Sequence, residues 1–167
     1  MRTQLRIVCA LILALATFPI AGAVATAGGA CTIEGTNGND SLSGGGAGDV
    51  ICAKAGNDRV RARGGNDDVL GSRGRDALRG GRGRDELVGA GGVDELRGGN
   101  GRDALRGGAK ADTVDGGNGA DLLIGGFGAD VLDARDGRGN DTIRAGAGRD
   151  LCYVDPGDSA RGCQTIV

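Results

Sequence analysis

Residues 80–88 read Gly-Gly-Arg-Gly-Arg-Asp-Glu-Leu-Val, and residues 98–106 read Gly-Gly-Asn-Gly-Arg-Asp-Ala-Leu-Arg. Both are nine-residue units with glycine at places one, two and four, aspartate at place six and leucine at place eight. Variants of this unit fill most of the 167-residue chain. A tandem repeat of this kind decides the architecture, because each unit must pack against its neighbours in the same way.

Aspartate holds place six in thirteen repeats, and only the two-residue insertion at Ala134-Arg135 breaks the interval of nine. The series is Asp40, Asp49, Asp58, Asp67, Asp76, Asp85, Asp94, Asp103, Asp112, Asp121, Asp130, Asp141 and Asp150. Place eight is apolar throughout: Leu42, Ile51, Val60, Val69, Leu78, Leu87, Leu96, Leu105, Val114, Leu123, Leu132, Ile143 and Cys152. Compositional bias alone does not hold two series in phase over this length.

The chemistry of each place predicts its conformation. Glycine at places one, two and four permits a tight turn with positive φ and close backbone approach. Places seven to nine, with one apolar side chain between two polar or small ones, predict a short strand that buries only its middle residue. Nine residues then make half a coil, and two units close a coil of 18 residues. We therefore predict an all-β fold, a parallel β-roll of about six and a half coils and about 30 Å in length.

One apolar side chain in nine buries little surface against the conformational entropy of ordering the chain. Aspartates aligned coil over coil would also repel one another. A divalent cation bound by carboxylate and carbonyl oxygens removes this repulsion, and calcium suits such a flexible, all-oxygen site better than magnesium. The sequence therefore predicts a fold that forms on calcium, while the ion-free chain remains open to the alternative of disorder.

The repeat is similar to the RTX nonapeptide, Gly-Gly-x-Gly-x-Asp-x-apolar-x, and the similarity covers residues 35–153. This resemblance implies that places one to six form a calcium-binding turn and that each ion lies between turns 18 residues apart. Asp40 would share an ion with Asp58, and Asp49 with Asp67. One edge would carry Asp40, Asp58, Asp76, Asp94, Asp112, Asp130 and Asp150, and the other Asp49, Asp67, Asp85, Asp103, Asp121 and Asp141. The gaps between these aspartates allow at most 11 ions.

Some repeats depart from the pattern. Ala47 and Lys110 replace the glycine of place four. An ammonium group beside two carboxylates would replace or repel an ion, so the sites around Asp112 are expected to be the weakest. The insertion at Ala134-Arg135 is expected to bulge one turn and leave the alternation of strands intact. Terminal sites should also be weaker, since only one neighbouring coil orders them.

The composition argues against catalysis. The chain has no His and no Trp, and its only aromatic residues are Phe18, Phe127 and Tyr153. Without His, the Ser/His/Asp and Cys/His mechanisms are excluded. Polar residues outside the repeat register are confined to Asp155, Asp158 and Arg161. We expect no catalytic residues.

The first 27 residues resemble an export signal. Arg2 and Arg6 precede an apolar run over residues 7–20, and cleavage after Ala23, Ala25 or Ala27 fits the small residues that follow. The run is shorter than the roughly 20 residues of a membrane-spanning helix, although an uncleaved anchor and a lipid-modified Cys31 remain alternatives. We predict a secreted, extracellular protein with no transmembrane anchor after removal of the signal.

Four cysteines remain once Cys9 leaves with the signal. In an exported chain an even number favours disulfides, and proximity favours Cys31 with Cys52 and Cys152 with Cys163 among three possible pairings. A four-cysteine zinc site is the alternative, but neither pair has the short spacing of such sites. We predict a roll over residues 28–153 and a disulfide-linked cap over residues 154–167.

Arginine is frequent for a calcium-binding repeat. Arg75, Arg84, Arg102 and Arg149 precede the repeat aspartate, and Arg61, Arg79, Arg97, Arg106 and Arg144 stand at place nine. Loss of Arg2 and Arg6 takes the net charge from −2 to −4, and 11 calcium ions would bring it to +18.

The arginines leave two functions open. One is a structural or calcium-buffering surface module. The other is a calcium-dependent adhesin that binds anionic cell-surface polymers through arginines such as Arg79, Arg97 and Arg106. Nucleic acid is not expected as a partner, since Phe127 and Tyr153 offer no stacking platform.

Overall fold

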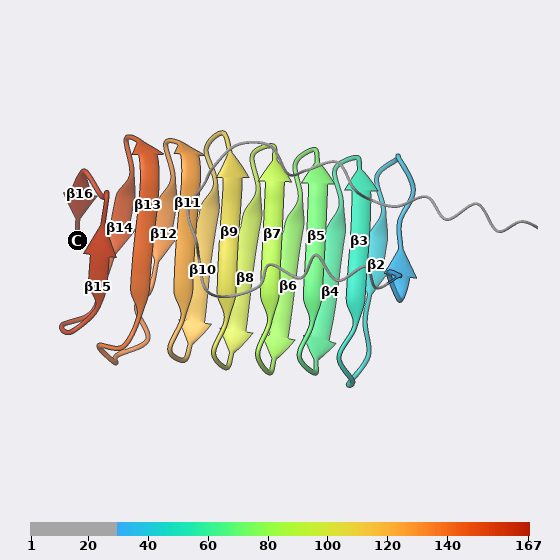
Figure 1. Ribbon diagram of the computed structural model, residues 1–167, viewed down its shortest axis with the longest axis horizontal. Coiled ribbons are helices and arrows are strands. Elements are labelled where there is room, and N and C mark those ends of the chain that lie inside the picture. Colours follow the sequence, from blue (N-terminus) through green and yellow to red (C-terminus); the bar gives the residue numbers. More distant parts are fainter. Residues whose placement is uncertain (1–29) are drawn as a thin grey trace, which may run out of the picture. The chain divides into compact units, whose positions relative to one another are not determined.

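The computed structural model describes residues 30–167, and they form the predicted β-roll of two parallel sheets (Figure 1). The described residues contain no helix, and so none that is long and apolar enough to cross a membrane. The export signal predicted for residues 1–27 lies outside the described part of the chain.

Successive strands alternate between two eight-stranded sheets. The odd sheet consists of β1 (Ile33–Glu34), β3 (Val50–Ala55), β5 (Asp68–Arg73), β7 (Glu86–Gly91), β9 (Ala104–Ala109), β11 (Leu122–Gly128), β13 (Thr142–Gly148) and β15 (Ser159–Arg161). The even sheet consists of β2 (Ser41–Ser43), β4 (Arg59–Gly64), β6 (Ala77–Arg82), β8 (Glu95–Asn100), β10 (Thr113–Asn118), β12 (Val131–Asp133), β14 (Leu151–Tyr153) and β16 (Thr165–Ile166). Equivalent places lie side by side, as Val60 pairs with Leu78 and Leu78 with Leu96. The predicted 18-residue coil is confirmed.

Most strands are longer than the sequence predicts. Those in the middle coils contain six residues, which continue from place seven into place three of the next repeat. Two of the six point inward: in β4 these are Val60 at place eight and Ala62 at place one, both fully buried. Place one is glycine or alanine, small enough to lie between the sheets. The prediction of a three-residue strand was wrong because glycine carries no hydrophobic signal.

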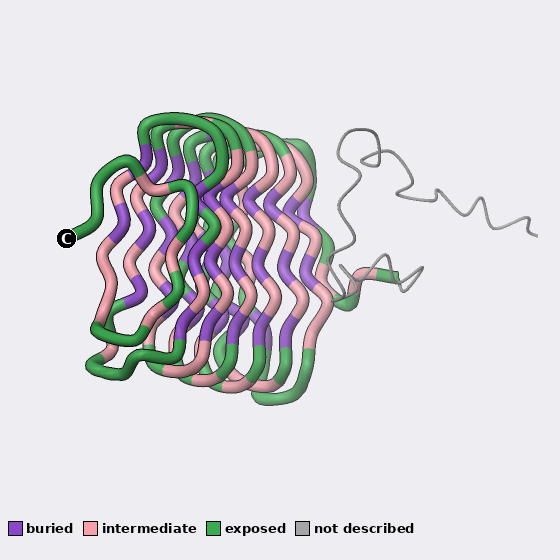
Figure 2. The backbone as a smooth tube through the Cα atoms, turned by 60° about the vertical axis from the view of Figure 1, so that its left-hand side comes forward, coloured by how far each residue is buried: buried purple, intermediate pink, exposed green. Residues whose placement is uncertain are grey.

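The core is a column of place-eight side chains between the two sheets. Every member of the apolar series from Ile51 to Cys152 is at most 3% exposed, whereas Leu42 at the N-terminal end is only partly buried. Figure 2 shows the buried positions aligned from coil to coil. One apolar residue per repeat therefore suffices for a continuous core, because every coil covers the next.

Glycine is required where the turns stack. At place four, Gly83 and Gly101 have φ of 122° and 142°, in the region that side chains disfavour. A Cβ on Gly101 would also overlap the carbonyl oxygen of Gly83 in the preceding coil. Gly46, at place three of a turn, has open space where its Cβ would lie.

The insertion leaves the alternation intact, as predicted. β12 still pairs with β10 and β14, and β13 with β11, although Asp121 and Asp141 are now 20 residues apart. Beyond the predicted end of the roll at residue 153, β15 and β16 each add a strand to one sheet. The C-terminal segment thus continues the coil.

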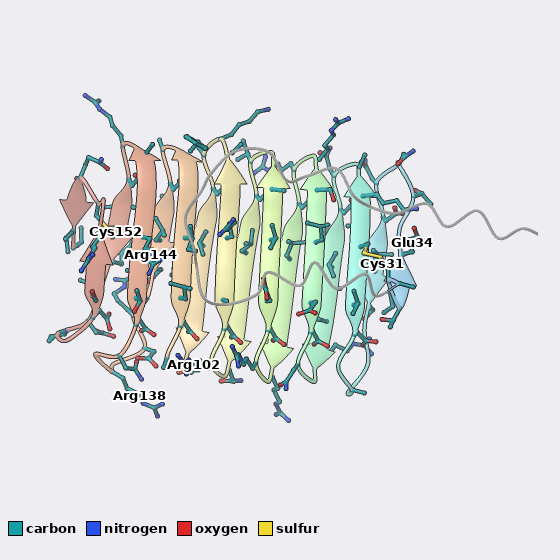
Figure 3. The ribbon with its side chains drawn as sticks, viewed as in Figure 1. Cys31, Glu34, Arg102, Arg138, Arg144 and Cys152 are labelled. Atoms are coloured by element: carbon teal, nitrogen blue, oxygen red, sulfur yellow. A yellow bond between two sulfur atoms is a disulfide. The ribbon has the colours of Figure 1, made fainter. Side chains whose placement is uncertain are left out.

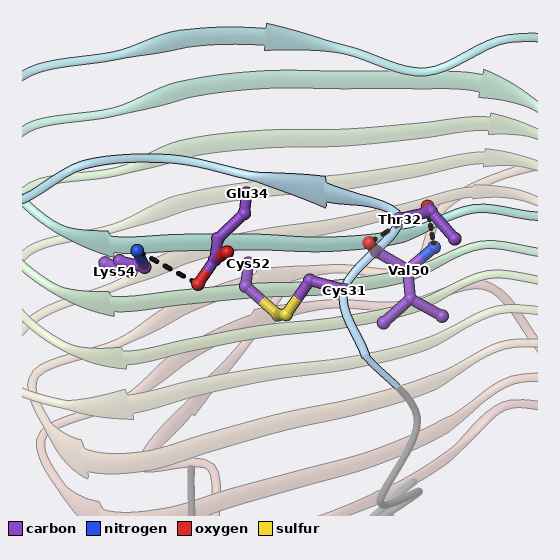
Figure 4. The surroundings of a disulfide bond; sticks show 6 residues. All are labelled: Cys31, Thr32, Glu34, Val50, Cys52 and Lys54. Atoms are coloured by element: carbon purple, nitrogen blue, oxygen red, sulfur yellow. Dashed lines mark hydrogen bonds and ion pairs between the residues drawn. A yellow bond between two sulfur atoms is a disulfide. The ribbon is translucent and has the colours of Figure 1, made fainter. Parts of the chain in front are cut away.

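The structure confirms both favoured disulfides. Cys31 is bonded to Cys52, and Cys152 to Cys163, at opposite ends of the roll. At the N-terminal end an ion pair of 3.0 Å between Glu34 and Lys54 lies beside the bridge (Figure 4).

We expect Gly101→Ala to destabilise the calcium-loaded roll by about 2 kcal/mol or more, because it combines a disfavoured φ with overlap of the neighbouring backbone. Thermal unfolding in saturating calcium measures the change. Gly46→Ala is the matched control, expected to shift stability by no more than about 0.5 kcal/mol. Equal melting temperatures for both variants would contradict this account of the turns.

Candidate metal centre

Eleven of the thirteen repeat aspartates are buried inside the turns. They run without interruption from Asp58 to Asp150, and each is at most 3% exposed. Each stands where the chain leaves a glycine turn and enters a strand. The fold therefore places two rows of carboxylates within the protein, one along each edge.

One carboxylate oxygen of each buried aspartate binds the neighbouring coil. The backbone N–H of Asp58 donates to Oδ1 of Asp76 at 2.9 Å, and that of Asp85 donates to Oδ1 of Asp103 at 2.8 Å. The same bond joins Asp40 to Asp58 and Asp49 to Asp67. The aspartates predicted to share an ion are thus brought together in stacked pairs.

The second carboxylate oxygen has no partner. Oδ2 of all eleven aspartates from Asp58 to Asp150 is buried without a hydrogen bond. A buried carboxylate oxygen left unsatisfied is costly, and eleven equivalent ones mark a position built for a cation.

Backbone oxygens converge on the same place. A Cβ on Gly98 would lie 2.6 Å from Oδ2 of Asp103 and 2.5 Å from the carbonyl oxygen of Gly116 in the next coil. For Gly89 the distances are 2.6 Å to Oδ2 of Asp94 and 2.8 Å to the oxygen of Gly107. Calcium binds oxygen at about 2.3–2.6 Å. The glycine of place one therefore leaves a cradle where oxygens from two coils meet, which fits a bridging calcium ion.

Side chains alone do not complete such a site. Within residues 30–167, no three His, Cys, Asp or Glu side chains gather closely enough to hold a metal. An ion would take its remaining ligands from turn carbonyls, which calcium accepts readily.

Alanine at place one narrows some cradles. Ala53, Ala62, Ala134 and Ala145 precede Asp58, Asp67, Asp141 and Asp150, and their side chains are buried. The cradles from Asp76 to Asp130 all have glycine at this place and are the most open.

The carboxylates are electrostatically unfavourable without an ion. Burial raises the pKa of Asp103 and of Asp112 to about 7, against the lowering effect of the bond from the preceding coil. Charged neighbours one coil away on either side raise both pKa values further. For the same leading cause the pKa of Asp76 and of Asp141 rises to about 6.

The two ends of the array differ from its middle. Oδ2 of Asp40 accepts the N–H of Thr36 at 2.7 Å, and Oδ2 of Asp49 accepts that of Gly45 at 2.9 Å. These two predicted ligands are partly exposed and have no free inner oxygen. The difference agrees in direction with the expectation of weaker terminal sites.

At the C-terminal end two side chains take over the acceptor role that the sequence analysis did not assign. Asp158 Oδ1 accepts the N–H of Asp141 at 3.0 Å, and Gln164 Oε1 accepts that of Asp150 at 2.6 Å. Their separations of 17 and 14 residues from these partners hid them from a search at intervals of 18.

Lys110 does not disturb the carboxylate beside it in the repeat. Asp112 retains the buried, unpaired Oδ2 of its neighbours, while Lys110 is exposed. Burial raises the pKa of Asp94, and the N–H of Asp76 and the Lys110 ammonium oppose that rise. Weak calcium binding around Asp112 stays a prediction.

A family model described as RTX calcium-binding nonapeptide repeat matches the chain in four copies, over residues 32–60, 61–96, 97–132 and 134–159. No curated protein matches the chain.

The raised pKa values predict opposite effects of acid with and without calcium. Since these aspartates bind protons more tightly in the roll than in the unfolded chain, the ion-free roll is most stable below about pH 4 and loses stability as the pH rises through about 6 to 7. Calcium competes with those protons, so its half-saturating concentration should rise as the pH falls. Circular dichroism between about pH 8 and pH 5, in chelator and in calcium, measures both. A calcium midpoint independent of pH would contradict the assignment.

Proposed function

The chain belongs to the RTX calcium-binding nonapeptide repeat family, and from this membership we propose that it is a secreted, non-catalytic module that folds around its calcium ions. The thirteen aspartates of place six are the proposed ligands. The single observation that carries the proposal is the double row of buried Oδ2 atoms from Asp58 to Asp150 without partners.

Calcium would act as a structural ligand. In its absence the ionised carboxylates of each row repel along the roll axis, and only their Oδ1 atoms are satisfied. An ion in each cradle neutralises two coils at once and supplies the missing partner of Oδ2. The 11 ions allowed by sequence spacing equal the number of free Oδ2 atoms, but the free atoms begin at Asp58 and not at Asp40.

Export and the disulfides support one another. The predicted signal over residues 1–27 would direct the chain to an oxidising compartment, where bridges form and persist. We propose that Cys31–Cys52 and Cys152–Cys163 close the two ends of the roll, where one face of a coil has no neighbour. Residues 154–167 then act as a cap that contains the last coil.

A non-catalytic role is favoured by what the residues outside the repeat register do. Asp155 accepts the N–H groups of Asp136 and Gly137, and Asp158 accepts those of Asp141 and Asp155. Both carboxylates thus hold the last turns together. Asp155 and Asp158 are better explained as structural groups than as catalytic ones.

Attachment to an anionic cell-surface polymer is the second candidate function. It is favoured by place-nine arginines that are exposed on the roll, Arg61, Arg79 and Arg97 among them. This function would require the first, because the folded roll arranges the arginines.

Asp103→Asn tests the role of the carboxylates. Asparagine keeps an oxygen that can accept the N–H of Asp85 but removes the charge. We expect the variant to need at least about threefold more calcium for half-maximal folding, against wild-type midpoints of roughly 10⁻⁴ to 10⁻³ M. Circular dichroism of the mature chain, titrated with calcium from a chelated start, measures the midpoint.

The control is Asp68→Asn, which removes the same charge from a half-exposed side chain at place seven. Its midpoint should match that of the wild type, and magnesium should replace calcium poorly in all three proteins. A roll that forms equally well in chelator, or equal midpoints for the two variants, would refute the proposed function.

A further inference from the structure

The place-nine arginines do not form one face. Arg61, Arg79 and Arg97 lie on β4, β6 and β8 of the even sheet. Arg106, Arg144 and Arg161 lie on β9, β13 and β15 of the odd sheet, where Figure 3 labels Arg144. The grouping of Arg79 and Arg97 with Arg106 as one binding surface is therefore wrong, because consecutive repeats belong to opposite sheets.

On the even sheet the three arginines form a row in register. Arg61 is the direct neighbour of Arg79, and Arg79 of Arg97. Parallel strands lie about 4.8 Å apart, so the row places three cationic groups across three adjacent strands. All three residues are exposed. Like charges at directly opposed positions destabilise a sheet, and this row has two such contacts.

The protein does little to neutralise this row. Arg97 pairs with Glu95 of its own strand at 2.9 Å. In the part of the chain that the structure describes, neither Arg61 nor Arg79 has an ion pair. Arg59 adds a further exposed cation to β4, and the row ends at Asp115, the neighbour of Arg97 on β10. On the odd sheet, by contrast, Arg106 stands between Val88 and Ile124.

We propose that the row Arg61, Arg79 and Arg97 is a docking site for a linear phosphodiester polymer that lies along the roll axis across β4, β6 and β8. A small anion can neutralise one or two of the cations, whereas a chain of regularly spaced phosphates can neutralise all three. The guanidinium group is suited to this task, since its planar fork binds phosphate oxygens in pairs. The proposal rests on the proposed function, because only the folded roll brings residues 18 apart into register.

The surroundings of the row favour a ligand recognised through its phosphates alone. Exposed Phe127 is on β11 of the odd sheet, and the ring of Tyr153 on β14 is covered by the guanidinium of Arg135, 4.3 Å from its centroid. The row thus has no open aromatic ring beside it on which bases could stack. A polymer of phosphates with short, flexible linkers fits this surface better than a nucleic acid does.

Binding to immobilised poly(glycerol phosphate) in saturating calcium tests the site. The triple variant Arg61→Gln, Arg79→Gln, Arg97→Gln is compared with the triple variant Arg106→Gln, Arg144→Gln, Arg161→Gln, which removes the same charge from the same place of the repeat on the other sheet. We expect the first to lose at least tenfold in affinity and to flatten the dependence of log affinity on log salt by about 2. The second should stay within about threefold of the wild type.

Circular dichroism of every variant in calcium separates docking from folding. If the wild type forms the roll but does not bind the polymer, or if both triple variants lose affinity equally, the site is refuted and the proposed function stands. Failure of the wild type to form a roll in calcium would refute the proposed function itself. Heparin or single-stranded DNA that binds as tightly, with the same dependence on the row, would overturn the phosphodiester assignment. Should the triple variant fold poorly, Arg79→Gln alone removes the middle of the row and is expected to lose about threefold.

Discussion

The contact on which the roll depends is the one between an aspartate and the coil before it. Each buried carboxylate accepts the backbone N–H of the aspartate 18 or 20 residues earlier through Oδ1 and keeps Oδ2 free. The first oxygen fixes the register of neighbouring coils. The second creates a charge that the folded protein alone does not compensate. Stacking and metal binding are therefore performed by the same side chain, which explains why place six is always aspartate.

The main features of this arrangement follow from the sequence. The interval of nine gave the 18-residue coil, the apolar series at place eight gave the core, and the stacking of Asp40 on Asp58 followed from the spacing and the family resemblance. The assignment of Arg79 and Arg106 to different sheets was also accessible, since nine residues separate opposite sheets and 18 separate neighbours.

Other features were hidden for physical reasons. The six-residue strands depend on glycine or alanine at place one, whose inward position leaves no hydrophobic pattern. The roles of Asp158 and Gln164 could not be predicted from periodicity, because the last coil is shorter than the others. That Asp40 and Asp49 hydrogen-bond within their own turns depends on backbone conformation, which the spacing of residues does not specify.

The most direct measurement of the central claim is amide hydrogen exchange of the mature, disulfide-bonded chain near neutral pH, with calcium and with chelator. If a cation between stacked carboxylates is what stabilises the roll, the N–H groups of Asp76, Asp94 and their equivalents will be protected in calcium and will exchange at nearly unfolded rates in chelator. Equal protection of these amides in both conditions would contradict the account.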